Sequence, residues 1–204
     1  MKHLIRSAAR PLVLGLALVL MLFAAPDARA GKAAEAYVQK LADDAMAIIN
    51  NSSLSKAQKN TQLGTLLDAN IEVEKIGLFT LGPHRRTAAQ GDLDAYLAAF
   101  HEYLIAYYVK NLGNLSRATF KVTGSSDLSR NRGTVVASTA SGDGGDPIEI
   151  NWRVVNDSSV QDIQVAGVWM ALSLREQMVS VIDNNQGKVA AATAKLREIV
   201  AGLS

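Results

Sequence analysis

Apolar residues recur at helical spacing through the first half of the chain. Between residues 34 and 49 they return every three or four positions, which predicts an amphipathic helix. Ser55 has the side chain of a good N-cap and predicts the start of a second helix, with leucines along residues 63–67. A short helix is predicted over residues 72–81, and a longer one with a wide apolar stripe over residues 92–113.

From residue 116 the apolar period shortens from about 3.6 to about 2, which is typical of strands with one buried face. Four strands are predicted, and their inward residues are Phe120 and Val122, then Val135 and Ala137, then Ile148, Ile150, Trp152 and Val154, then Ile163 and Val165. The fourth strand spans residues 160–166. Residues 141–146, rich in Gly and Asp, predict a hairpin connection. Helical spacing returns over residues 171–182 and 189–203.

Helices followed by consecutive strands and then by further helices indicate the α+β class. We predict helices packed on the apolar face of a curved, mainly antiparallel, four-stranded sheet. No repeat or Pro-rich linker divides residues 31–204, which are therefore interpreted as a single domain.

The first thirty residues have the pattern of a secretory signal peptide. Three basic residues precede an apolar run over residues 12–25, and Ala28-Arg29-Ala30 matches the A-x-A cleavage pattern. As a helix this run would span about 21 Å, less than the roughly 30 Å of a bilayer core, which favours cleavage over a membrane anchor. We expect residues 1–30 to be removed and the mature protein to be exported.

The excess positive charge of the chain lies in the expected signal peptide. The formal net charge of the whole chain is +2, whereas residues 1–30 hold four basic residues and one acidic residue, so the remainder is close to neutral. A near-neutral protein lacks the broad basic surface of a nucleic-acid binder. We expect no nucleic-acid partner.

Residue types needed for most catalytic and metal sites are scarce. The chain has no cysteine, and its mature part has two histidines, His84 and His101. It contains no H-E-x-x-H, G-x-S-x-G, P-loop or G-x-G-x-x-G pattern. We therefore predict a protein that is not an enzyme and has no metal or cofactor. The enzymatic alternative, Asp162 or His101 acting with a tyrosine inside a cone-shaped sheet, has no motif in its favour.

The interior of such a fold can be built in two ways. A helical layer over a curved sheet can fill the space with its own side chains, or it can enclose a cavity for an apolar ligand. The spacing of apolar residues is the same in both cases. The residue pattern alone therefore leaves a packed interaction domain and a carrier of apolar ligands open.

Two stretches resemble a known family. The first runs from Leu78 to Ala88, continues with Tyr96, Phe100, Tyr103-Leu104 and Tyr107, and is similar to L-G-x-x-W-R-x-A…F…F…YL…Y. The second covers residues 147–154 and 160–172 with Arg175, and is similar to p-i-x-v-d-W-r-v … v-x-D-v-x-v-e-G-v … R. Both patterns belong to the periplasmic lipid-binding component of the Mla (maintenance of lipid asymmetry) transport system, also called the toluene-tolerance auxiliary family. Arg85 stands where that family has Trp, and Ala166 where it has Glu.

The resemblance implies a soluble carrier without catalysis. Such a carrier holds the acyl chains of a phospholipid inside an NTF2-like cone, with the headgroup at the mouth. It shuttles the lipid between an outer-membrane Mla lipoprotein complex and an inner-membrane Mla ABC transporter complex. A related branch of the family accompanies hopanoid biosynthesis, so a hopanoid or another apolar lipid is the alternative ligand.

We assign the lipid site to both layers of the predicted fold. The acyl chains are expected to contact Phe79, Phe100, Leu104, Tyr107, Ile150, Trp152, Val154, Ile163 and Val165, with Val168 and Trp169 near the entrance. Arg85 and Arg86 are expected to contact the headgroup phosphate or an anionic partner surface. The alternative for these two arginines is a solvated basic loop.

Overall fold

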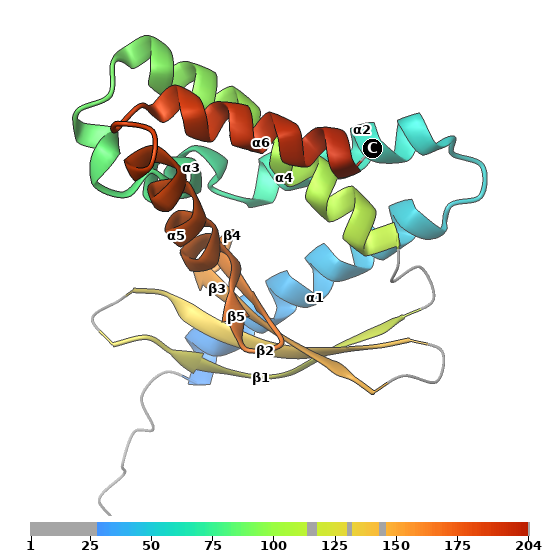
Figure 1. Ribbon diagram of the computed structural model, residues 1–204. Coiled ribbons are helices and arrows are strands. Elements are labelled where there is room, and N and C mark those ends of the chain that lie inside the picture. Colours follow the sequence, from blue (N-terminus) through green and yellow to red (C-terminus); the bar gives the residue numbers. More distant parts are fainter. Residues whose placement is uncertain (1–27, 114–117, 130–131, 143–145, 204) are drawn as a thin grey trace, which may run out of the picture.

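The computed structural model describes residues 28–113, 118–129, 132–142 and 146–203 (Figure 1). Most of the expected signal peptide, residues 1–27, lies outside these described residues, and so do residues 143–145 of the predicted hairpin connection. Within the described ranges, no helix is both long enough and apolar enough to cross a membrane.

Five antiparallel strands form one sheet in the order of the chain. They are β1 (Thr119–Asp127), β2 (Thr134–Ser141), β3 (Ile148–Val155), β4 (Ser159–Val165) and β5 (Val168–Trp169). The register shifts between Val122 and Gly124 on β1, and between Arg153 and Val154 on β3. Such irregularities bend strands and increase their twist. The predicted α+β class and antiparallel sheet are confirmed.

The prediction of four strands is wrong by one. The chain turns at Ala166 and Gly167, whose φ angles are 47° and 84°, and β5 then pairs Val168 with Val165. Two successive residues with positive φ suit a two-residue hairpin turn. Ala166 therefore lies in a turn rather than in the fourth strand. A two-residue strand that leads directly into a helix is too short to show an alternating pattern.

The buried face of β2 is opposite to the predicted one. Its buried residues are Thr134, Val136, Ser138 and Ala140. Val135 and Ala137, predicted to point inward, are half-buried on the other face. The register fixes this face, because Val136 lies opposite Trp152 on β3 and directly paired residues share one face of a sheet. Two of the four inward residues carry hydroxyl groups, so the hydropathy pattern indicates the wrong face.

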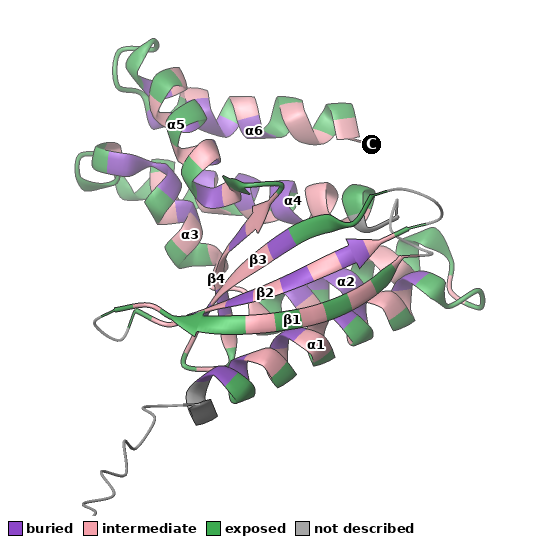
Figure 2. Ribbon diagram, turned by 90° about the horizontal axis from the view of Figure 1, so that it is seen from below, coloured by how far each residue is buried: buried purple, intermediate pink, exposed green. Residues whose placement is uncertain are grey.

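The helices lie on one side of the sheet and beside it. They are α1 (Ala28–Asn50), α2 (Lys56–Asn70), α3 (Val73–Thr80), the short 3-10 helix η1 (Gly82–Arg86), α4 (Gln90–Gly113), α5 (Met170–Asp183) and α6 (Val189–Leu203). In Figure 1, α3, α4, α5 and α6 form a layer above the sheet, and α1 runs along β1 and β2. β1 itself, at the edge of the sheet, is exposed or half-buried along its length (Figure 2).

Helix ends follow the local sequence. Ser55 caps α2 as predicted, since its Oγ accepts the Gln58 N–H over 3.3 Å and the Gln58 Oε1 accepts the Ser55 N–H over 2.9 Å. The third helix ends at Thr80, one residue before the predicted end. The fourth begins at Gln90, which places Asp92 in its first turn, where a carboxylate interacts favourably with the helix dipole.

The main core lies within the helical layer. Its fully buried members include Leu81, Tyr96, Phe100, Met178, Ile182 and Leu196. Smaller clusters lie between α1 and the sheet. The space between the helical layer and the sheet is therefore not part of the largest packed cluster.

Candidate functional site

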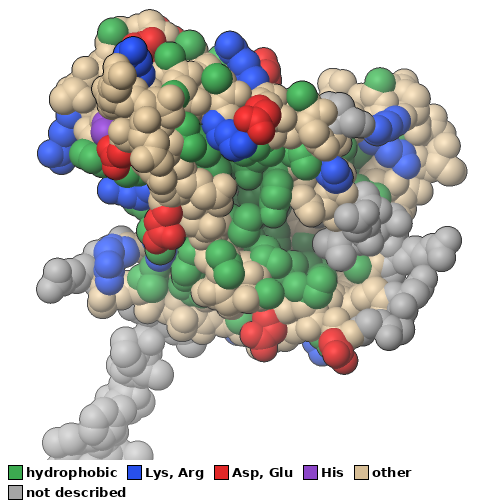
Figure 3. All heavy atoms as spheres, viewed as in Figure 1, with side chains coloured by type: hydrophobic (Ala, Val, Ile, Leu, Met, Phe, Trp, Pro, Cys, Tyr) green, Lys and Arg blue, Asp and Glu red, His purple; other side chains and the backbone are tan. Residues whose placement is uncertain are grey.

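An apolar cavity of about 360 Å³ lies between the inner face of the sheet and helices α1, α2 and α4. Its lining consists of Leu41, Ala42, Ala45, Met46, Leu63, Gly64, Leu66, Leu67, Asn70, Ile71, Ile105, Tyr107, Tyr108, Val109, Asn111, Ala118, Phe120, Ala140, Ile148, Ile150, Trp152, Ile163 and Val165. Among the described residues, no charged side chain lines it. Figure 3 shows the hollow between the helical layer and the sheet, with hydrophobic side chains on its walls.

Several polar groups of this lining are bonded to the protein itself. The Trp152 indole N–H donates to Ser138 Oγ over 2.9 Å. The Asn70 amide donates to Leu66 O over 2.7 Å, and its Oδ1 accepts the Tyr37 hydroxyl over 3.0 Å. Because these groups are paired, they present mainly carbon surface to the cavity. A ligand there meets mainly hydrocarbon.

Small residues keep the space open. Ala42 and Ala45 on α1, Gly64 on α2 and Ala140 on β2 are all buried, and all line the cavity. At Gly64 a Cβ atom would lie 3.3 Å from Ile105 Cδ1, so α2 and α4 already approach closely there. Several small residues thus line the cavity, and its volume falls within the roughly 300–1,000 Å³ typical of small-molecule sites.

The comparisons with known proteins agree with this geometry. The family model described as MlaC protein matches residues 39–198. The chain belongs to the MlaC family. A solved structure of a phospholipid-binding protein from Ralstonia solanacearum, in complex with a phospholipid, has a TM-score of 0.70 and 22% identity, covering 83% of this chain and 98% of that one. At this identity the match shows a shared fold. No curated protein matches the chain significantly.

The structure brings five of the predicted site residues together around the cavity. Tyr107 lies on α4, Ile150 and Trp152 on β3, and Ile163 and Val165 on β4. The β3 and β4 residues face the same space because Ile150 pairs with Val165 and Trp152 with Ile163. Strand alternation and the resemblance to the MlaC family identified this wall.

Phe100 and Leu104 lie deeper, within the helical layer. Phe100 is fully buried and Leu104 is 8% exposed, and both belong to the core cluster of α4, α5 and α6. They border a second void of about 40 Å³ and not the main cavity. On a helix, residues three and four apart share a face, and this part of the α4 stripe packs against other helices.

Four further predicted residues lie outside the cavity lining. Val154 is on the inner face of the sheet, but Ala34 and Val38 of α1 cover it. Val168 shares a face with Val165 but is 52% exposed on the edge strand. Trp169 lies on the opposite face, where the Arg153 guanidinium is 5.0 Å from its ring centroid.

Phe79 is the fourth of these residues. It is 38% exposed on α3, and the Arg175 guanidinium lies 4.8 Å from its ring centroid. The same guanidinium donates to Phe79 O over 3.0 Å. Phe79 therefore belongs to the contact between α3 and α5.

Sequence reasoning missed the wall formed by α1 and α2. This wall includes Leu41, Met46, Leu63, Leu66 and Leu67. All of them except Met46 lie on helical stripes that the spacing of apolar residues predicts. The available signal was the nearby Ala42, Ala45 and Gly64, since small residues on facing helices mark a place where side chains leave space.

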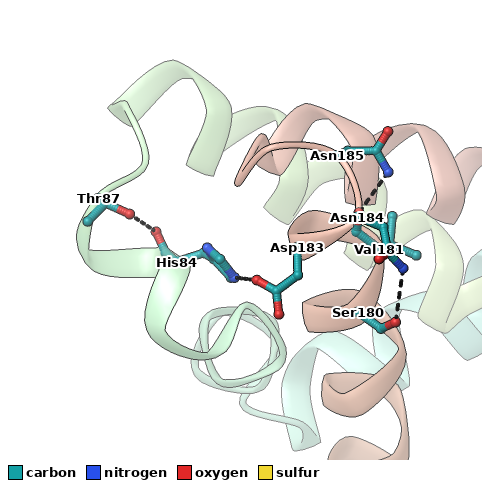
Figure 4. Close-up of polar contacts among 7 residues, drawn as sticks. All are labelled: His84, Thr87, Ser180, Val181, Asp183, Asn184 and Asn185. Atoms are coloured by element: carbon teal, nitrogen blue, oxygen red, sulfur yellow. Dashed lines mark hydrogen bonds and ion pairs between the residues drawn. The ribbon is translucent and has the colours of Figure 1, made fainter.

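Arg85 and Arg86 are exposed on η1, and neither lines the main cavity. Their neighbour His84 joins η1 to the end of α5, since its Nε2 lies 2.9 Å from Asp183 Oδ1 (Figure 4). His84 O also accepts the Thr87 hydroxyl over 3.3 Å. The basic segment is thus fixed at the surface, and its two arginines lie outside the lining of the main cavity.

The candidate acid–base residues have structural partners. Asp162 Oδ1 accepts the N–H of Ile163 over 2.8 Å and that of Ala171, at the start of α5, over 2.9 Å. Burial raises the pKa of Asp162, against the effect of these two bonds. His101 Nε2 lies 2.6 Å from Asp68 Oδ1 on the surface between α4 and α2. Neither of these two residues lines the main cavity.

Proposed function

We propose that this protein is a periplasmic phospholipid carrier, which holds acyl chains in the cavity between its sheet and its helices. The observation that carries the proposal is the uncharged and largely apolar lining of that cavity, in which the Trp152 indole and the Asn70 amide are bonded to the protein itself. Membership of the MlaC family supports it, as does a similar fold that was solved with a phospholipid.

Shielding the tails from water is the task of such a carrier. Each buried methylene favours binding by about 0.8 kcal/mol relative to water. A lipid taken from a bilayer already has its tails in an apolar phase, so the net free energy of transfer is far smaller. The kinetic barrier is exposure of the tails to water, and the protein lowers it by enclosing them.

Partners then decide the direction of transport. We infer that the carrier docks on an inner-membrane Mla ABC transporter complex and on an outer-membrane Mla lipoprotein complex. The rim of the cavity suits transfer into an apolar channel, because the lining residue Ile148 is 41% exposed. A polar headgroup at this rim stays in contact with water, which avoids the cost of burying it.

The proposal includes export. Residues 1–30 are removed, and residues 31–204 fold as one domain. The intact mass of the protein recovered from a periplasmic extract should equal that of a chain that starts at Gly31. A single cooperative unfolding transition of this mature chain is the second expectation.

Lipid mass spectrometry of the gently purified mature protein tests the central claim. The expected result is a bound phospholipid that is extracted unchanged, and a protein free of lipid would overturn the proposal. A hopanoid in the extract would replace the phospholipid as ligand. A chemically altered lipid after prolonged incubation would indicate an enzyme.

A matched pair of variants locates the site. Val165→Asp places a charge in the cavity wall, which costs several kcal/mol without a partner, so a folded variant should lose its lipid. Val135→Asp makes the same change on the opposite face of the sheet, directly across from Arg153, and should keep it. Equal lipid content in the two variants would contradict this location.

A further inference from the structure

A second, smaller void lies directly behind the main cavity. It has a volume of about 40 Å³ and lies among α3, α4, α5 and β4. Both spaces are lined by Ile71, Tyr107, Tyr108 and Ile163. These four residues, here called the partition, therefore separate the two spaces.

Two tyrosines form the α4 side of the partition, and their rings brace one another. The ring of Tyr107 lies 5.8 Å from that of Tyr108 at 86°, an edge-to-face contact. Tyr107 also lies 5.7 Å from Tyr103, which continues into a row of rings with Phe100 and Tyr96. The Tyr107 ring is restricted by its neighbours, because a change in its position would also disturb the contacts of the other rings. It therefore supports the Tyr108 ring in its place.

The partition stands at the inner end of the cavity. Ile148, at the start of β3, is 41% exposed, whereas Ile163 is 6% exposed and pairs with Trp152, four residues further along β3. At about 3.3 Å per residue, this path runs about 13 Å inward from the exposed rim. A lipid with its headgroup at the rim directs the methyl ends of its tails along this path.

The void beyond the partition is suited to hydrocarbon. Most of its lining is apolar, with Phe100, Leu104, Met170 and Leu174 among the contacts. Asp162 also borders it, but its Oδ1 already accepts two backbone N–H groups. The space would therefore accept further methylenes if the partition opened.

We propose that Tyr108, braced by Tyr107, sets the maximum acyl-chain length that this carrier accepts. The inference rests on the proposed function. Chains that end before the partition fit entirely, and longer chains leave methylenes in water at the rim. Each methylene that moves from water into the protein favours binding by about fourfold, which is about 0.8 kcal/mol expressed as a ratio.

The test uses the mature protein and its Tyr108→Leu variant, which removes the ring and keeps an apolar side chain of moderate size. Delipidated samples are equilibrated with vesicles of didecanoyl, dilauroyl and dimyristoyl phosphatidylglycerol in equal amounts. Native mass spectrometry then measures the distribution of bound species. The variant should raise the ratio of dimyristoyl to didecanoyl lipid several-fold over the unsubstituted protein.

A second substitution shows that the void is the space gained. Ala171 lines the void and is 7% exposed, so Ala171→Val fills part of it from the α5 side. In the double variant the distribution should return toward that of the unsubstituted protein, while Ala171→Val alone should leave it unchanged. Circular dichroism confirms that each variant is folded; for a misfolded Tyr108→Leu protein, Tyr108→Met is the replacement.

The outcomes separate the two proposals. An unchanged distribution in a folded Tyr108 variant that still carries lipid would overturn the partition as a limit on chain length and leave the carrier intact. No lipid on the unsubstituted protein would overturn the carrier itself. A shift that Ala171→Val does not reverse would also contradict the inference, since the added space would then lie elsewhere.

Discussion

The Trp152 indole N–H donates to Ser138 Oγ over 2.9 Å, and the same hydroxyl donates to Ile150 O over 2.8 Å. Ser138 is 2% exposed, so both bonds lie in a region without water. This arrangement holds the indole against the floor of the cavity with its one polar atom turned into the sheet. Because the Ser138 hydroxyl pairs the only polar atom of the Trp152 side chain, the indole presents carbon atoms to the cavity.

Replacing Ser138 with Ala should destabilise the protein. The indole N–H would lose its acceptor, and a buried donor without a partner costs about 1–3 kcal/mol. Urea denaturation measures this loss in the free energy of unfolding. Ser126→Ala, the same change at an exposed position of β1, should stay within about 0.5 kcal/mol. Equal values for the two variants would show that Ser138 does not position Trp152.

Much of the fold follows from local pattern. The spacing of apolar residues identifies all six α-helices, because each has a face against other elements, and the capping box at Ser55 fixes the start of α2. The buried face of β2, in contrast, does not follow from the local pattern. Ser138 and Thr134 point inward because of pairing partners on β3 and β1, and an alternation of hydropathy within one strand contains no information on these partners.

The candidate site was predictable mainly on its sheet side, and on its helical side only at Tyr107. Ile150, Trp152, Ile163 and Val165 share one face through strand alternation, so they follow once the strands are known. Whether Leu41 and Leu63 line a cavity depends on whether the residues opposite them fill the space or leave it empty. That depends on contacts between segments far apart in the chain, such as Gly64 against Ile105, and periodicity cannot reveal these.

The start of η1 depends on Gly82. Its φ is +59°, and a Cβ atom there would lie 2.7 Å from Val179 Cγ2. Gly82→Ala should therefore lower the free energy of unfolding by about 1–2 kcal/mol for the left-handed conformation, with a further loss from the clash with α5. Thermal unfolding measures this loss of stability.

Gly91→Ala is the matched control for Gly82→Ala. A Cβ atom at Gly91, in the first turn of α4, meets nothing within 4 Å. Ala has the higher helix propensity by as much as about 1 kcal/mol, so this variant should be as stable as the unsubstituted protein or more so. A Gly82→Ala protein that unfolds at the same temperature as Gly91→Ala would rule out the steric account.

Arg85 and Arg86 should affect docking more than lipid content. Both are exposed on η1, and neither lines the main cavity. Replacing both with Ala should leave the amount of bound lipid unchanged and slow transfer to membranes that carry the Mla partner complexes. A fluorescent-lipid transfer assay measures the rate.

The control variant carries Lys56→Ala and Lys121→Ala, which remove the same charge from other exposed positions, and it should transfer lipid at the normal rate. A lower lipid content in the arginine variant would favour contact of Arg85 and Arg86 with the headgroup instead.

Asp162 should make stability depend on pH in an unusual direction. Burial raises its pKa above the ordinary 3.8, so the folded protein binds this proton more tightly than the unfolded chain. The charged carboxylate therefore costs stability at pH 7, and the cost disappears as pH falls through the raised pKa towards 3.8.

Asp162→Asn keeps an oxygen acceptor for the two N–H groups without the charge. Its stability relative to the unsubstituted protein should be greatest near neutrality and should shrink on acidification, as urea denaturation across this range would show. Asp146→Asn, at an exposed position before β3, is the control; an advantage of Asp162→Asn that grows on acidification would mean that the carboxylate stabilises the fold.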